Sequence, residues 1–458
     1  MLIKEFHSLL ERGWRSAFPG ARSHNRAIEH AIALSCMLGR RTISRTLGAL
    51  GRWDQDWSAD YKVFSRCRWK PERLFDPVID EYLERYQKGP VIAAVDDTNL
   101  RKTGRKIKGA SWHRDPLSPP FHMNFMYGLR FLQASLLFAH YQEGDYPPRG
   151  IPVRFKEAPP LKKPGKRASA EEHAQYNQLK KEKNLSTQAL EVVRELRQSL
   201  DQRGGVTRWL LFVGDGSFAN KRMFKAELDR THLLARCRKD ARLCFRAPEG
   251  TRRKYAQQLF TPNQVRTQED RCWNRARVYL GNKWRMVRYK EVKDVLWKRG
   301  AGTRPLRLIV IAPVPYKLSK NSHWNYREPA YFLTTDLQTP IKLLVQACFD
   351  RWQIEVNHRD EKDLLGVGQA QVRSELSIPR HPALAVASYS LLLLAALKSF
   401  GPGRTNDYLP HPKWRKQGSK RASLLDIVSK LRSETNEASV SQLLPQNFAE
   451  NLVMYADS

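Results

Sequence analysis

Short apolar runs in the middle of the chain predict buried strands. Residues 91–95 are all apolar and lead into Asp96, and residues 209–213 are all apolar and lead into Gly214-Asp215-Gly216. Apolar runs of this length that stop at turn-forming residues are typical of strands buried on both faces. We therefore expect a sheet in which two strands each end on a carboxylate.

Other segments show the periodicities of a mixed fold. Residues 125–141 are rich in β-forming residues, 233–237 predict another strand, and 170–200 predict one long charged helix. A connection at residues 156–166 carries prolines and like charges, which exclude regular structure. The order of strands, helix, strand, helix and strand favours an α/β fold with an RNase H-like mixed sheet.

The first 88 residues read as a helical, DNA-binding domain. Residues 40–47 contain a polar turn and a basic helix start, which is the pattern of the second helix of a helix-turn-helix motif. A plain helical bundle with a solvated basic face fits the same residues equally well. The two interpretations stay open at this point.

The remaining organisation is predicted from changes in composition. Alternating aromatic, apolar and basic residues predict a β-rich insertion before the helical stretch at residues 343–365. The insertion carries 16 Lys and Arg against four Asp and Glu between residues 251 and 310, a local net charge of +12. The expected segments are a helical domain at 1–88, a first part of the core at 89–247, the insertion at 248–316, a second part of the core at 317–400, and a basic tail with a helix at 401–458.

The net charge points to a polyanionic partner. The chain carries 80 Lys and Arg against 46 Asp and Glu, a formal charge of +34, and 41% of its residues are hydrophobic. A folded protein this basic repels itself unless a polyanion is nearby, so nucleic acid is the expected partner. The basic residues are interleaved with 12 Trp, 16 Tyr and 18 Phe, which suits phosphate contact combined with base stacking. A merely soluble basic surface is the competing interpretation.

Cysteine usage and hydropathy indicate an intracellular protein. The six cysteines form no C-x-x-C pair, so neither a zinc site nor a disulfide framework is indicated, and a reducing compartment fits. The first residues do not have the pattern of a signal peptide. The apolar run at 383–397 is shorter than the roughly 20 residues that span a membrane, so we expect a buried helix there.

Three carboxylates are candidates for metal-dependent phosphodiester chemistry. Asp96 and Asp215 are expected at strand ends, and Glu355 lies in a predicted helix, residues 343–365, where Arg351 and Lys362 fall on the same face. Phosphodiester cleavage needs Mg²⁺ held by oxygen ligands. Each acid also has a structural interpretation, since Asp96 and Asp215 suit turns and Glu355 suits an ion pair with Arg351.

The spacing of these residues resembles the signatures of bacterial insertion-sequence DDE transposases. The matching motifs are Asp96-x-Thr98, the Val-Gly-Asp-Gly-Ser-Phe around Asp215, and Arg351-x₃-Glu355-x₆-Lys362, which resembles their YREK pattern. The chain departs from that pattern at the tyrosine position, where Cys348 stands. Residues 331–336 also resemble this family, and the acid that ends them is expected to be a neighbouring strand-end residue.

The resemblance implies a DNA transposase that cuts and joins. Asp96, Asp215 and Glu355 would be catalytic residues and ligands of two Mg²⁺ ions, with Mn²⁺ as a substitute. The enzyme would cleave at the terminal inverted repeats of its insertion sequence and join the 3′-OH ends to target DNA. Its partners would be double-stranded DNA and a second copy of the chain, with no membrane, in the cytoplasm of a bacterium near the nucleoid.

The resemblance also implies DNA contacts outside the triad. Arg351 and Lys362 would hold phosphates near the cleaved end. The further DNA-binding candidates are His358, Arg359, Trp284, Trp297 and Trp273. The tryptophans would stack on a flipped base, although each suits the core of a small sheet as well. Two alternatives remain, namely a catalytically silent or domesticated relative that only binds DNA, and a nuclease that cuts without joining.

Overall fold

The protein is a mixed α/β molecule whose residues form two compact units. The computed structural model describes residues 1–115, 118–119, 121–319, 321–414 and 420–454. Unit 1 comprises Met1–Gln87, Asp97–Asn184 and Ile354–Ser458, and unit 2 comprises Lys88–Asp96 and Leu185–Gln353. The strand β1 (Val91–Arg101) contributes its first half to unit 2 and its second half to unit 1. Residues 415–419, which hold part of the expected basic tail, lie outside the described residues.

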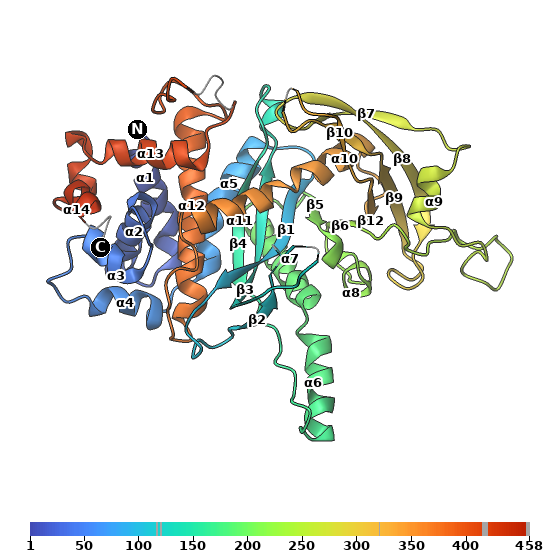
Figure 1. Ribbon diagram of the computed structural model, residues 1–458, viewed down its shortest axis with the longest axis horizontal. Helices are drawn as coiled ribbons and strands as arrows, with labels where there is room; N and C mark the ends of the chain where they lie inside the picture. The colour runs from blue at the N-terminus through green and yellow to red at the C-terminus, as the bar shows by residue number, and fades with distance from the viewer. Residues whose placement is uncertain (116–117, 120, 320, 415–419, 455–458) are drawn as a thin grey trace. The chain divides into compact units, whose positions relative to one another are not determined.

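Unit 2 is built on a mixed sheet in the order β1-β5-β6-β12-β9-β8-β7 (Figure 1). The first three strands are parallel, and the later neighbours are antiparallel. The strands of this sheet after β1 are β5 (Leu210–Gly214), β6 (Thr231–Arg236), β7 (Asn274–Tyr279), β8 (Trp284–Leu296), β9 (Pro305–Ile311) and β12 (Ala330–Thr334), and a separate pair is formed by β10 (Val314–Tyr316) and β11 (Asn325–Arg327). The strands expected in the β-rich insertion, β7, β8 and β9, therefore belong to the same sheet and join it where β9 pairs with β12.

Apolar helix faces support this sheet. The helices of unit 2 are α7 (Leu185–Gln202), α8 (Lys221–Phe224), α9 (Pro262–Thr267) and α10 (Ile341–Asp350). The helix α7 buries the face that carries Leu190, Val193 and Leu196, which is the three-to-four spacing of an amphipathic helix. All five residues of β5 are buried, as a central parallel strand requires.

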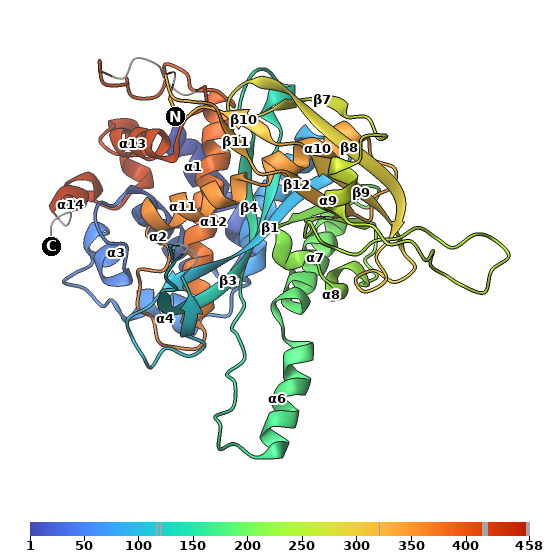
Figure 2. The ribbon, with the colours of Figure 1, turned by 45° about the vertical axis from the view of Figure 1, so that its right-hand side comes forward.

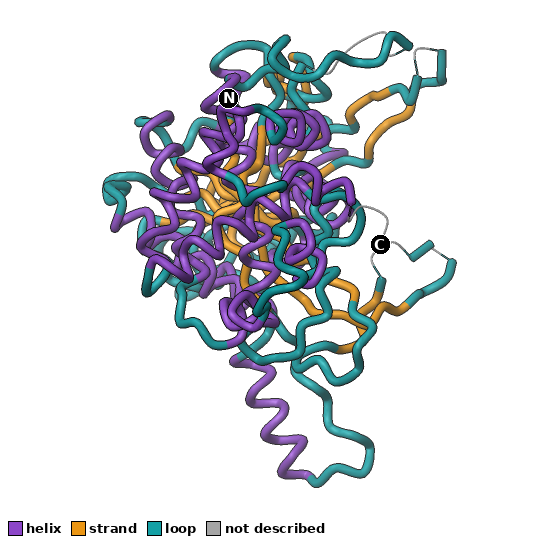
Figure 3. The backbone as a smooth tube through the Cα atoms, turned by 90° about the vertical axis from the view of Figure 1, so that its left-hand side faces the viewer, coloured by secondary structure: helices purple, strands orange, loops and turns teal. Residues whose placement is uncertain are grey.

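The predicted single helix at residues 170–200 is wrong, because the chain breaks between α6 (Ala170–Glu182) and α7. The side-chain amide of Asn184 donates hydrogen bonds to the carbonyls of Lys180 and Lys181, at 3.3 and 3.0 Å. An asparagine amide that bonds these carbonyls competes with the backbone and ends the helix. The helix α6 buries none of its residues and extends away from the body of unit 1 (Figure 2), and residues 158–169 lead to it without regular structure (Figure 3).

Unit 1 packs helices around one long apolar helix, α12 (Ser377–Phe400). The other helices of unit 1 are α1 (Leu2–Trp14), α2 (Ala21–Cys36), α3 (Ile43–Ala49), α4 (Ser58–Ser65), α5 (Asp76–Arg85), α6, α11 (Gln353–Asp363), α13 (Leu424–Glu434) and α14 (Phe448–Met454). The helix α12 contacts α1, α2 and the strand β4 (Arg149–Glu157). It is long and apolar enough to cross a membrane by composition, but 83% of its apolar window is buried inside the structure. The expected buried helix at 383–397 is the centre of α12.

The strands of unit 1 are built around β3 (Phe125–Phe138), which is a neighbour of β1. The strand β3 pairs antiparallel with β2 (Ser111–Arg114) and with β4. Close approach of β3 to β1 requires a glycine, since a Cβ on Gly128 would lie 2.4 Å from the carbonyl oxygen of Leu100. The rings of Phe131 and Phe155 stack between β3 and β4 with centroids 4.6 Å apart.

Candidate active site

The two predicted aspartates of unit 2 come from neighbouring parallel strands. The register of β1 on β5 runs from Val91 opposite Leu210 to Val95 opposite Gly214. Asp96 is the next residue of β1 and Asp215 directly follows β5, and paired strands lie about 4.8 Å apart. The two carboxylates therefore lie close together, at the point where the pairing of β1 with β5 stops.

The strand β1 does not end at Asp96 as the sequence suggested. It continues to Arg101, so Asp96 lies inside a strand at the point where the pairing with β5 stops. The apolar run predicts where burial on both faces ends, and it does not predict where the extended backbone ends. The side chain of Asp96 is 18% exposed, which leaves the carboxylate within reach of solvent.

Asp215 is held by a local turn. Its Oδ1 accepts hydrogen bonds from the backbone N–H of Ser217 at 2.9 Å and from the Ser217 hydroxyl at 2.6 Å, so it caps a short 3₁₀ helix, Gly216–Phe218. A Cβ on Gly214 would lie 2.9 Å from the ring of Phe218, which explains the glycine before the aspartate. The expected turn role of Asp215 is thus present, and it orients the carboxylate through one oxygen.

Arg351 lies against Asp96 within unit 2. Its Nη1 is 3.7 Å from Asp96 Oδ2, and the side chains are 16% and 18% exposed. The predicted continuous helix at 343–365 is wrong, since α10 ends at Asp350 and α11 begins at Gln353. The backbone N–H of Trp352 donates to the carbonyl of Phe349 at 3.2 Å, and this shift to i−3 bonding tightens and ends α10.

Glu355 and Lys362 belong to α11 in unit 1. Glu355 is half-buried in the first turn of the helix. The pKa of Lys362 is lowered, because burial lowers it by more than the carboxylates of Glu361, Asp363, Asp97 and Asp115 raise it. Lys362 therefore stands among acids at the other end of the helix from Glu355.

The two second-rank candidates on α11 differ in exposure. His358 is only 9% exposed. The Arg359 side chain is 65% exposed, and its Nη2 pairs with Asp360 at 2.9 Å. Only Arg359 of these two therefore presents its charge to solvent, while the predicted DNA contacts of both residues stay predictions.

The tryptophans of unit 2 pack against neighbours in that unit. Arg277 lies over the ring of Trp284, 4.9 Å from its centroid, and Lys290 lies over the ring of Trp273 at the same distance. Trp297 meets Phe224 edge to face at 5.7 Å. All three rings are half-buried, which suits a structural role, and their predicted stacking on a base stays a prediction.

Asp336 has a structural task in unit 2. It is 1% exposed, and its Oδ1 accepts hydrogen bonds from the backbone N–H groups of Gln338 and Thr339, at 2.9 and 2.8 Å. Burial by itself raises the pKa of Asp336, but these hydrogen bonds lower it below its usual value. The carboxylate holds the turn that leads from β12 toward α10.

The carboxylates brought together within one unit are thus Asp96 and Asp215. Among the residues that the structure describes, no group of three or more His, Cys, Asp or Glu is arranged to hold a metal ion. A scan against models of protein families and a search of curated proteins give no match to this chain.

The site chemistry therefore rests on the geometry of the chain itself. Two partly exposed carboxylates lie close together, and a guanidinium neutralises one of them. Carboxylate oxygens are the ligands that Mg²⁺ prefers, and it uses one or two of them together with waters and substrate phosphates. Asp96 and Asp215 fit this donor set.

Proposed function

We propose that this chain is a DDE-type DNA transposase with an RNase H-like core. The observation that carries the proposal is the placement of Asp96 and Asp215 on adjacent parallel strands. The strand order β4-β3-β1 in unit 1 and β1-β5-β6 in unit 2 also supports it, because two parallel strands follow an antiparallel group as in an RNase H-like sheet. The net charge of +34 supports a polyanionic substrate.

Asp96 and Asp215 would hold the Mg²⁺ ions, with Glu355 as the third ligand that the resemblance implies. A bound metal pair supplies activation of the attacking oxygen and neutralises charge on the phosphate. The residues of the chain orient the substrate: Arg351 beside Asp96 presents a guanidinium whose planar fork matches a phosphate. The Asp215 carboxylate is kept in place by Ser217, so it needs little reorganisation before it binds a ligand.

A second candidate, a relative that binds DNA without cutting it, is favoured by the same ion pair. The guanidinium of Arg351 already balances the charge of Asp96, which is the task of a metal in an active site. In that case the basic surface alone would carry the function, through sequence-independent contacts with phosphates.

Cleavage and joining of the DNA ends distinguish these candidates. Purified protein is incubated with Mg²⁺ and a labelled duplex that carries the inverted repeats flanking its own coding sequence. The variants are Asp96→Asn, Asp215→Asn and Glu355→Gln, and the control is Asp240→Asn, which removes an exposed carboxylate elsewhere in unit 2. The transposase proposal expects cleavage and strand joining in the wild type and the control, and loss of both in the three variants.

Three outcomes contradict the transposase proposal. Cleavage by Asp215→Asn at the wild-type rate removes Asp215 from the active site. Tight binding by the wild type without any cleavage in Mg²⁺ or Mn²⁺ favours the DNA-binding relative. Cleavage without joined products identifies a nuclease.

A further inference from the structure

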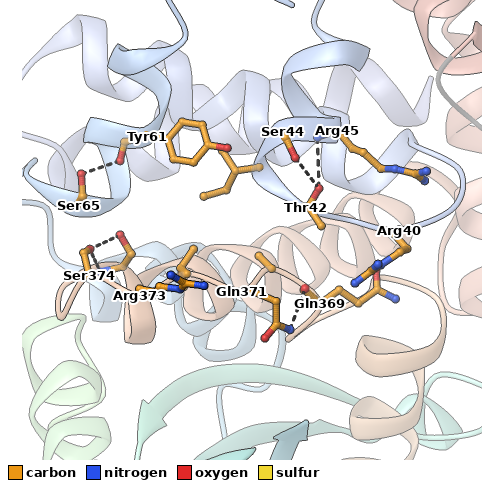
Figure 4. Close-up of a pocket in the computed structure, with 14 residues that line it drawn as sticks. Arg40, Thr42, Ser44, Arg45, Tyr61, Ser65, Gln369, Gln371, Arg373 and Ser374 are labelled. Carbon is orange, nitrogen blue, oxygen red and sulfur yellow. Dashed lines mark hydrogen bonds between the residues drawn. The ribbon is translucent and has the colours of Figure 1, made fainter. Parts of the chain in front are cut away.

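Unit 1 contains a cleft whose walls come from opposite ends of the chain. It has a volume of about 640 Å³ and is lined by residues 40 and 42–45 together with Tyr61 and Ser65 on one wall, and by residues 369–374 and 377 on the other (Figure 4). We call it the arginine cleft, after Arg40, Arg45 and Arg373. In Figure 4, Arg40 and Arg45 stand at one end of the cleft, and Arg373 stands on the wall opposite Tyr61.

The charges around the arginine cleft are not balanced by the protein. Among the residues that the structure describes, no Asp or Glu lines it. Within the described part of the chain, the guanidinium groups of Arg40, Arg45 and Arg373 form no ion pair or hydrogen bond. The nearby carboxylate of Glu375 is paired with Lys108 at 2.6 Å. The cleft therefore gathers three uncompensated positive charges in one concave space.

The walls of the cleft are fixed from behind. The backbone N–H of Arg41 donates to Oε1 of Gln369 at 2.6 Å, a hydrogen bond between residues 328 positions apart. The guanidinium of the buried Arg41 donates to the carbonyls of Leu34 and Met37, which holds the turn before α3. On the other wall, Lys102 Nζ donates to the carbonyls of Gly368 and Ala370, at 2.7 Å each. The arrangement thus exists before any ligand binds.

The polar lining suits phosphate oxygens. Besides the three arginines, the cleft is lined by the hydroxyl residues Thr42, Ser44, Ser65, Ser374 and Ser377 and by the amides of Gln369 and Gln371. Guanidinium groups contact phosphates in protein–nucleic acid complexes. Of the hydroxyls, those of Ser65 and Ser374 already donate to the Tyr61 carbonyl and to Ser377 Oγ, at 3.0 and 2.6 Å. Tyr61 is 37% exposed at the rim, and its ring meets that of Trp57 edge to face at 5.4 Å, so an aromatic surface borders the charged one.

We infer that the arginine cleft binds the phosphodiester backbone of DNA. The choice of DNA as the polyanion rests on the proposed function; the preference for phosphates rests on the cleft alone. Its volume exceeds what one phosphate needs and falls within the range of about 300–1,000 Å³ that holds small-molecule ligands, so adjacent phosphates of one strand can be bound. Such contacts position the DNA without reading its sequence.

The arginine cleft includes most of the segment 40–47 that suggested a helix-turn-helix motif. The helix α3 begins at Ile43, within the segment 40–47 where a helix start was expected, but five of its seven residues are buried, namely Ile43, Thr46, Leu47, Gly48 and Ala49. Most of α3 is therefore unable to enter a groove of DNA. The arginines at its start face the cleft instead, and the contribution of this segment to binding is contact with the backbone.

The test measures DNA affinity without any requirement for catalysis. Binding of a labelled duplex of arbitrary sequence is followed by fluorescence anisotropy in EDTA, for the wild type and for the double variant Arg45→Gln/Arg373→Gln. The matched control is Arg22→Gln/Arg167→Gln, which removes two exposed arginines of unit 1 that do not line the cleft and that form no ion pair with the described residues. Equal melting temperatures show that all the proteins are folded.

The cleft variant should bind DNA about tenfold more weakly, and the slope of log affinity against log salt should become shallower by about 1.8, because each neutralised phosphate contributes about 0.9. For the control, the slope should become shallower by less than half of that amount. Ser44→Glu, which places a carboxylate in the cleft, should weaken binding at least as much as the double variant. Equal losses in the cleft variant and the control overturn the inference.

Two further measurements, mononucleotide binding and cleavage of the DNA ends, distinguish DNA from a small phosphate compound as the ligand and the cleft inference from the transposase proposal. If a mononucleotide binds the wild type and not the cleft variant while DNA affinity is unchanged, the ligand is a small phosphate compound and the DNA assignment is wrong. If DNA binds through the cleft but the ends are never cleaved, the transposase proposal fails and the cleft stands. If the ends are cleaved and the cleft variant binds and cleaves like the control, the cleft inference fails alone.

Discussion

Asp60 is the most informative residue for the stability of the N-terminal helices. It is completely buried, and its carboxylate accepts hydrogen bonds from Arg26 Nη1 at 3.0 Å, His30 Nε2 at 3.0 Å and Arg52 Nη1 at 2.9 Å. These partners come from α2 and from the segment before α4. Asp60 also lies beside Tyr61 and anchors the helix that forms one wall of the arginine cleft.

Asp60→Asn keeps the shape of the side chain and removes its charge. Breaking a buried ion pair from one side costs about 3–5 kcal/mol, because the remaining charges stay desolvated without a partner. Arg26 and Arg52 are 33% and 18% exposed and so recover some solvation, which favours the lower end, about 3 kcal/mol. For a unit of this size each kcal/mol lowers the melting temperature by about 2 °C, so the expected decrease is about 6 °C.

The assay is thermal and urea unfolding of the full chain. The control Asp54→Asn makes the same chemical change at an exposed aspartate six residues earlier and should leave the melting temperature within about 1 °C. If Asp60→Asn and Asp54→Asn melt together, the network contributes no net stability and the reasoning is refuted.

The carboxylate of Asp60 also makes the stability of the fold depend on pH. Burial by itself raises the pKa of Asp60, but the hydrogen bond and charge of His30 and the charges of Arg52 and Arg26 lower it below its ordinary value of 3.8. A lowered carboxyl pKa means that the stabilisation is fully present above pH 3.8 and is lost as the pH falls through the folded-state pKa. Wild type and Asp60→Asn should therefore converge in stability only under acid conditions below pH 3.8.

Three further predictions test other parts of the molecule. Burial raises the pKa of Glu361 from 4.5 to about 8, so its contribution to stability is fully present below pH 4.5 and is lost as the pH rises through 8. Glu361→Gln should therefore raise the melting temperature near pH 8.5 and leave it unchanged near pH 4. Equal melting temperatures of variant and wild type at both pH values would contradict this. Gly128→Ala would place a Cβ 2.4 Å from the Leu100 carbonyl oxygen and should cost at least about 1–3 kcal/mol of unfolding free energy, whereas Gly165→Ala, with nothing within 4 Å, should be neutral. DNA affinity should fall about 10³-fold or more between 50 and 200 mM salt if six or more phosphates are neutralised, and a flat titration would refute electrostatic binding.

Local patterns in the sequence were enough to predict the strands and the turn that position Asp96 and Asp215. The apolar runs before Asp96 and Asp215 predicted the strands β1 and β5, because a strand covered on both faces needs apolar residues at every position. The glycines around Asp215 indicated a tight turn, and the structure shows that turn with Asp215 as its cap. These features depend on residues within a few positions of one another.

Helix boundaries were predicted less well, for a local and specific reason. Both long helical patterns continue through the positions where the helices break, at Asn184 and at Trp352. Periodicity reports only which face is apolar. The breaks come from individual hydrogen bonds, a side-chain amide on two carbonyls in one case and an i−3 backbone bond in the other.

The sequence by itself determined which residues can be buried, which acids follow the buried apolar runs, and that the chain is strongly basic. Only the tertiary structure decided that β1 pairs with β5 in parallel, which sets Asp96 beside Asp215, and that residues 40–45 face residues 369–377 across a cleft. Neighbours along the chain fix local conformation through sterics and hydrogen bonds. Pairings between residues more than a hundred positions apart depend on the packing of the whole unit, and no local pattern encodes them.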